Sequence, residues 1–217
     1  MNEVWRYFTD NLDEIGRWTW TTIWLAAVPL VVGLIIALPI GWVASRYRWT
    51  YPPIVSGGGL LYTIPSLVLF LVLPGIIGTT ILSPVNVAVA LTIYTVALLV
   101  RVVADALSSV SQDTLAAASA MGYTAWQRLV GVQLPIAVPV IGAGLRVAAV
   151  SNVSLVSVAS IIGVAQLGQL FVNGYNLASV PPTIVGLILF ILLALVFDAV
   201  VLIATRLLSP WQRAGTR

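Results

Sequence analysis

The most constraining feature of this sequence is the stretch from Trp49 to Val100, which contains no charged side chain. A membrane-spanning helix needs about 20 predominantly apolar residues, so this stretch has room for two spans and the turn that joins them. The turn is expected over residues 74–86, where Pro, Gly, Thr, Ser and Asn cluster. Only 8% of all residues are charged and 60% are hydrophobic, which excludes a water-soluble domain with a polar surface. We therefore expect an integral membrane protein.

The remaining apolar segments predict about five transmembrane helices in a single domain of residues 1–217. These segments are too long for the strands of about ten residues that build a membrane barrel, so the expected fold class is all-α. The expected spans are residues 21–44, 53–73, 87–103, 136–162 and 183–205.

The arginines predict how the chain is oriented, because basic residues beside membrane spans are retained in the cytoplasm. Segments 74–86 and 163–182 carry no charge, and the arm of residues 1–20 is net acidic. The N-terminus is therefore expected outside and the C-terminus in the cytoplasm. Aromatic residues typical of interfacial belts lie near both ends of the first span. The arginines assigned to the cytoplasmic side are Arg46, Arg48, Arg101, Arg128, Arg206, Arg213 and Arg217.

Several kinds of chemistry are excluded by residue types that the chain does not contain. It has no Cys and no His, and all ten of its basic residues are Arg. Thiol nucleophiles, imidazole bases and the usual zinc ligand sets are therefore excluded, as is a Walker A loop, which needs Lys. We expect no enzymatic activity, metal, cofactor or nucleic-acid partner, and any ATP that drives the protein must be bound by another subunit.

The expected cytoplasmic loop of residues 108–135 is organised for docking to another protein. Asp113 is expected to cap a helix whose strong helix formers run from Thr114 to Arg128. Gly122 permits a sharp change of direction, and Pro135 begins the next span, where its missing N–H is harmless. An ordinary alanine-rich interfacial helix that joins two spans is the alternative interpretation. The small face expected of the helix consists of Ala116, Ala117 and Ala120.

This loop resembles that of the permease subunits of ATP-binding cassette (ABC) importers. Their pattern is Glu-Ala-Ala, three residues, Gly, nine residues, Ile, one residue, Leu-Pro, and its spacing is complete here, with Ala116 in place of Glu and Val132 in place of Ile. The resemblance implies the type I importer permease fold and a coupling helix that seats in a cleft of a separate ATPase. The residues that it assigns to coupling are Ala116, Ala117, Ala118, Gly122, Val132, Leu134 and Pro135.

The likeness extends over nearly the whole chain and narrows to the osmoprotectant permeases, which serve glycine betaine, choline and carnitine. It implies a multi-pass protein of the bacterial cell membrane in contact with lipid. Its implied partners are cytoplasmic ABC ATPase subunits, a second copy or a sister permease, and an external substrate-binding protein. The segments that carry the likeness are residues 39–41, 46–48, 63–66, 162–168 and 173–174.

Two other functions stay open beside this interpretation. One is an ABC permease for another small solute, such as an amino acid. The other is an ion-coupled carrier, although such a carrier is expected to need more acidic residues at mid-membrane depth than Asp198 supplies. A structural subunit of a larger membrane complex would have no use for the coupling loop.

Polar side chains inside the expected spans are candidates for a translocation path. Pro65 frees a carbonyl in the preceding turn, which either serves as a ligand for a cation or water, or is satisfied by a Ser or Thr side chain at a simple kink. In the fourth span, polar side chains either join helices or line an aqueous path. The path candidates are Tyr62, Thr63, Pro65, Ser66, Asn152 and Ser157.

Arg146 and Asp198 are the two ionisable residues expected inside the bilayer, where a charge is costly enough to suggest a function. A rise of 1.5 Å per residue puts both in the cytoplasmic half of the membrane. Since their charges are opposite, we expect an ion pair between the fourth and fifth spans. The alternative is that Arg146 reaches the interface while Asp198 faces water or a partner subunit.

Overall fold

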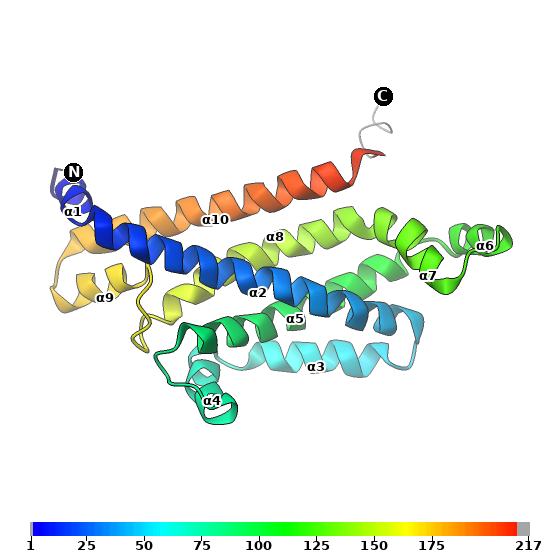
Figure 1. Cartoon of the computed structure of the whole chain (residues 1–217), viewed down its shortest axis with the longest axis horizontal. Helices are drawn as coiled ribbons and strands as arrows, with labels where there is room; N and C mark the ends of the chain where they lie inside the picture. The colour runs from blue at the N-terminus through cyan, green and yellow to red at the C-terminus, as the bar shows by residue number, and fades with distance from the viewer. Residues whose placement is uncertain (1, 212–217) are drawn as a thin grey trace.

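The computed structural model describes residues 2–211, which form a bundle of helices, and no strand occurs among these residues (Figure 1). Arg213 and Arg217, assigned above to the cytoplasmic side, lie outside the described residues. The elements are α1 (Asn2–Asp10), α2 (Leu12–Arg46), α3 (Tyr51–Thr63), α4 (Ser66–Ile77), α5 (Pro84–Ser108), α6 (Gln112–Ala120), α7 (Ala125–Arg128), the π-helix η1 (Leu129–Gln133), α8 (Leu134–Val158), α9 (Gln169–Asn176) and α10 (Val180–Leu208).

Four continuous helical segments are long and apolar enough to cross a membrane: α2, α5, α10 and the segment Ala125–Val158, which contains α8. Helices α3 and α4 together make a fifth candidate span, bent by 102° at the break between them. The second expected span, residues 53–73, is therefore interrupted by a sharp break. Its physical cause is Pro65, which lacks an N–H and pushes the preceding residue out of the helical conformation.

Helix α5 lies at the centre of the bundle, whereas α10 lies at its edge. Of the most apolar window of each helix, 61% is buried for α5 and 17% for α10. Close packing of α5 against α2 depends on two glycines of α2 that lie two turns apart. A Cβ atom on Gly33 would lie 2.5 Å from the side chain of Thr95, and one on Gly41 would lie 2.6 Å from that of Val103. These glycines bring the two helix backbones together.

The two ends of the bundle carry different elements (Figure 1). Helices α1, α4 and α9 lie at one end, and the loop that contains α6 and α7 projects from the other. The described chain begins at the first end, and α10 ends at the second, which we call the loop end. Opposite ends are what an odd number of membrane crossings requires.

Candidate functional site

Helix α6 displays the first half of the loop motif at the loop end of the bundle. Its N-cap is Ser111, whose Oγ accepts a hydrogen bond from the backbone N–H of Thr114 at 3.2 Å. The expectation that Asp113 caps the helix is wrong, because the helix begins one residue before it and Asp113 lies in the first turn. A carboxylate in the first turn still stabilises the helix through its interaction with the positive end of the helix dipole.

Gly122 ends this helix in a backbone conformation that favours glycine. Its φ is +85°, its N–H donates to the carbonyl of Ser119 at 3.0 Å, and the N–H of Tyr123 donates to that of Ala118 at 3.1 Å. This pair of bonds is the Schellman arrangement, which requires a left-handed residue at the position of Gly122. The helix-forming stretch predicted over 114–128 is thus divided by the turn, and α7 follows with its own capping box.

Exposure differs sharply between the two halves of the motif. Ala116, Ala117 and Gly122 are exposed, whereas Ala118 is buried. The second half, Val132, Leu134 and Pro135, is half-buried where the loop meets α8. Leu134 packs against a core cluster that includes Val103, Leu107, Leu129 and Ile141. The second half therefore anchors the loop, and the first half leaves a small, smooth surface open to a partner.

The break between α3 and α4 brings several path candidates to the molecular surface. Tyr62, Thr63 and Pro65 are exposed, and Ser66 is half-exposed. In the turn before Pro65, the carbonyl of Leu60 accepts a hydrogen bond from the hydroxyl of Thr63 at 2.7 Å, and that of Leu61 accepts one from the N–H of Ile64 at 3.3 Å. A Thr side chain thus satisfies this turn, as the alternative of a simple kink predicts. The carbonyl of Ile64 itself accepts a hydrogen bond from the hydroxyl of Tyr94. The rings of Tyr62 and Tyr94 meet edge to face with centroids 5.6 Å apart. Sequence reasoning missed this partner, because a contact across 30 residues leaves no local signal.

Asn152 joins three helices inside the bundle. Its side chain is 2% exposed, and its Nδ2 donates to Thr95 Oγ1 at 3.0 Å and to the carbonyl of Ala26 at 3.4 Å. These bonds connect α8 to α5 and α2, so in this conformation Asn152 packs helices and does not reach an open path. Ser157 is half-buried and donates to the carbonyl of Ser154 at 2.7 Å within its own helix.

Arg146 and Asp198 form the expected ion pair between α8 and α10. Nε and Nη2 of Arg146 each donate to a carboxylate oxygen of Asp198 at 2.7 Å, a bidentate geometry. The pair is not enclosed by this chain, because the two side chains keep 38% and 28% of their surface exposed. Both residues lie well inside helices that qualify as membrane spans.

Comparison with known proteins agrees with this architecture. A family model described as "Binding-protein-dependent transport system inner membrane component" matches residues 30–213. The chain belongs to this family. The permease is thus a multi-pass membrane subunit of a bacterial ABC import system, and ATP hydrolysis takes place in a separate subunit.

Named relatives of the permease cover nearly its whole length. It is 34% identical over 195 residues to the osmoprotectant import permease protein OsmW of Salmonella typhimurium, which spans 88% of this chain and 90% of the relative. It is 26% identical over 217 residues to the glycine betaine/carnitine/choline transport system permease protein OpuCB of Bacillus subtilis, spanning 100% of this chain and 99% of the relative.

A solved structure supports the expected fold. A chain of the MetNI methionine ABC transporter in an inward-facing conformation matches with a TM-score of 0.80, covering 92% of this chain and 98% of that chain at 21% identity. The permease therefore has the type I ABC importer permease fold.

Proposed function

We propose that the permease forms the translocation path for small quaternary-amine osmoprotectants of the glycine betaine, choline and carnitine class. The names of its relatives support this substrate class, since OsmW is an osmoprotectant import permease and OpuCB serves glycine betaine, carnitine and choline. In this proposal, an external substrate-binding protein delivers the solute, and no cofactor in the permease is needed for its passage.

The exposed face of α6 is the proposed contact with the ATPase. The observation that carries this part is the Schellman turn at Gly122, which ends a short helix with exposed Ala116 and Ala117. Alanine side chains let a groove in another protein approach the helix backbone closely. Since the second half of the motif is anchored in the core, movement of α6 by the ATPase would be transmitted to α8. The loop end is then cytoplasmic, and the N-terminus lies outside.

A second permease, either another copy or a sister subunit, is proposed to cover the exposed face of α8. Lipid is a poor neighbour for the half-exposed pair of Arg146 and Asp198, because a charge in the bilayer interior is costly. That cost is removed if the pair instead faces a second permease or an aqueous path between two permeases. The exposed residues of this face recur at spacings of three and four: Ile136, Val140, Ala143, Val147, Val150 and Ser154.

Uptake of labelled glycine betaine tests the proposal in cells that lack this gene and its redundant importers. The complemented strains carry the wild type, Gly122→Arg or Ser108→Arg. The Gly122 variant forces a bulky residue into a left-handed conformation, whereas Ser108 is an exposed residue at the end of α5, where an added cation suits the helix dipole. We expect uptake by the wild type and Ser108→Arg, and at least a tenfold loss for assembled Gly122→Arg.

Unlabelled competitors test the substrate class, whereas the Gly122→Arg strain and a strain without the ATPase subunit test the coupling to ATP hydrolysis. Inhibition by unlabelled choline and carnitine is expected, whereas competition by amino acids alone would replace the substrate class with another small solute. Equal uptake by the Gly122→Arg strain and the wild type would refute the coupling role of α6. Uptake that persists without the ATPase subunit would favour an ion-coupled carrier.

A further inference from the structure

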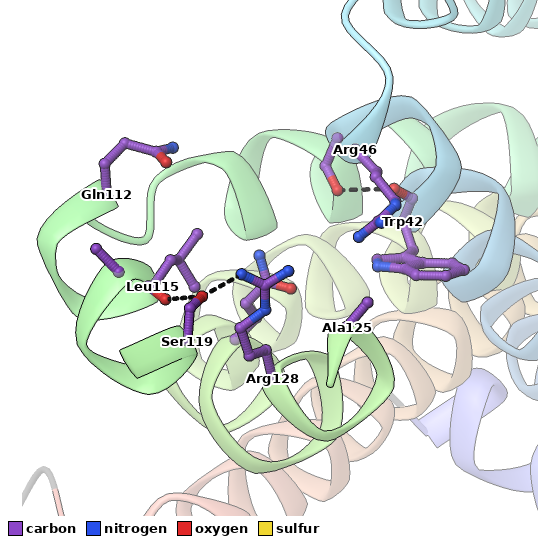
Figure 2. A pocket seen from close by; sticks show the side chains of 10 residues that line it. Trp42, Arg46, Gln112, Leu115, Ser119, Ala125 and Arg128 are labelled. Carbon is purple, nitrogen blue, oxygen red and sulfur yellow. Dashed lines mark hydrogen bonds between the residues drawn. The ribbon is translucent and has the colours of Figure 1, made fainter. Parts of the chain in front are cut away.

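A polar cavity of about 350 Å³ lies between the C-terminal end of α2 and the helices of the loop. This volume is at the lower end of the range of roughly 300–1,000 Å³ typical of small-molecule pockets. Figure 2 shows the side chains of Arg46 and Arg128 entering this space from opposite walls, from α2 and α7. Neutral hydrogen-bonding groups in the lining come from Ser45, Gln112, Ser119 and Gln133.

Both arginines are held in place by neutral groups. Nη1 of Arg128 donates to Ser119 Oγ at 2.5 Å, and that hydroxyl donates to the carbonyl of Leu115 at 2.7 Å (Figure 2). The guanidinium of Arg46 lies over the rings of Trp42 and Tyr47, 5.9 and 5.8 Å from their centroids. Neither arginine forms an ion pair within residues 2–211. The cavity therefore collects two positive charges without a carboxylate to balance them.

The cavity lies at the depth of lipid headgroups. Helix α2 carries no charge between Arg17 and Arg46, a distance of about 43 Å at 1.5 Å per residue. A bilayer with its headgroup regions is about 40–45 Å thick. When Arg17 lies in the headgroup region of one leaflet, Arg46 therefore reaches the headgroup region of the opposite leaflet. Exposed aromatic residues typical of this region surround the same end, including Trp49, which is 79% exposed, and Trp126, which is 65% exposed.

We propose that this cavity binds the phosphate group of an anionic phospholipid from the leaflet at the loop end. Guanidinium groups present paired N–H donors that match phosphate oxygens, and the anionic cytoplasmic leaflet concentrates such phosphates beside the cavity. One phosphate between Arg46 and Arg128 replaces their mutual repulsion with two attractions. It also connects α2 to α6 and α7, and so fixes the position of the coupling loop. This site does not depend on which solute the permease carries.

Lipid retention by the assembled transporter tests the proposal. The permease with its ATPase subunits is placed in nanodiscs of phosphatidylcholine and phosphatidylglycerol. Native mass spectrometry then counts the lipids that stay bound to the complex after it is released from the nanodisc. The cavity variant is Arg46→Gln with Arg128→Gln. Its matched control is Arg48→Gln with Arg206→Gln, which removes the same charge from exposed positions at the same end, outside the cavity lining.

We expect wild type and control to retain phosphatidylglycerol in preference to phosphatidylcholine, and the cavity variant to bind it about tenfold more weakly, as the loss of charge-assisted hydrogen bonds predicts. If the double variant fails to assemble, Arg128→Lys keeps the charge but removes the planar fork and is expected to give a several-fold loss. Equal retention by cavity variant and control would overturn the proposal.

Two further arms distinguish the lipid from other anions. Excess inorganic phosphate is added to the nanodiscs, and its displacement of the retained phosphatidylglycerol would identify a free ion as the occupant and overturn the lipid assignment. Retention is also compared with and without the ATPase subunits. Loss of the lipid when the ATPase binds would show that the cavity is a protein contact, whereas unchanged retention supports the lipid site.

Discussion

The crossing of α5 and α8 at Gly144 gives a prediction whose size follows from the structure. A methyl group added in Gly144→Ala would lie 2.5 Å from Cγ1 of Val102, 3.0 Å from Cγ2 and 3.1 Å from Cβ. Carbon atoms in favourable contact are about 3.5–4.0 Å apart, so the overlap is about 1 Å. Rotation of Val102 cannot remove it, because its Cβ is also too close. The two helices, which are joined by the coupling loop, must move apart.

The expected cost combines two opposing contributions. Overpacking costs about 1–3 kcal/mol, and replacing a helical Gly by Ala offsets about 0.5–1 kcal/mol, so we expect Gly144→Ala to destabilise the fold by about 1–2 kcal/mol. Val102→Ala alone removes part of a packed side chain at roughly 1 kcal/mol. The double variant lacks both Cγ atoms, and the remaining contact of the new methyl with Cβ of residue 102, at 3.1 Å, is relieved by a shift of a few tenths of an ångström. The double variant is therefore expected to be about as stable as Val102→Ala alone.

Unfolding of the purified permease in mixed micelles with increasing SDS, followed by circular dichroism, measures these differences. Gly59→Ala is the matched control, because no atom lies within 4 Å of the added methyl, and it should be as stable as the wild type or slightly more so. The reasoning is refuted if Gly144→Ala is as stable as this control. It is also refuted if the double variant loses the sum of the two single losses.

Two further predictions concern polar contacts between the spans. Asn152→Leu removes hydrogen bonds to two helices and should cost about 1–2 kcal/mol in the same SDS assay, with glycine betaine uptake by the assembled protein retained; lost uptake at unchanged stability would instead indicate a role in the path. Asp198→Asn leaves Arg146 without its carboxylate and should lower the yield of assembled transporter in affinity purification, and exchange of the two residues should restore it. Normal assembly and uptake by Asp198→Asn would contradict this role for the pair.

Much of the site was predictable where function depends on local spacing. The loop pattern from Ala116 to Pro135 identified the family, and its Gly122 needs only a few neighbouring backbone groups to form its turn. Local rules were less decisive where adjacent residues compete. Ser111 and Asp113 are both good N-cap residues, and the structure uses Ser111.

Most contacts between distant residues were beyond sequence reasoning, and the pair of Arg146 and Asp198 is the exception because opposite charges in apolar spans attract each other. The break at Pro65 was expected, but its angle of 102° and the hydrogen bond from Tyr94 to Ile64 depend on how α3 packs against α5. The polar run in the fourth span left helix packing and path lining both open, and it made Asn152 a path candidate. Its burial against Thr95 decided between them in this conformation.

The sequence by itself determined that the protein lies in a membrane, that it is helical, roughly where its spans lie and to which family it belongs. These properties follow from the scarcity of charge and from a motif of fixed spacing, and both can be recognised from the order of residues without knowing which distant residues are in contact. The tertiary structure alone decided that Asn152 meets Thr95 and that Arg46 and Arg128 share one cavity, and it decided between pairing and separation for Arg146 and Asp198. The physical reason is that the rotation and crossing of packed helices select these partners, and hydropathy along the chain does not encode that geometry.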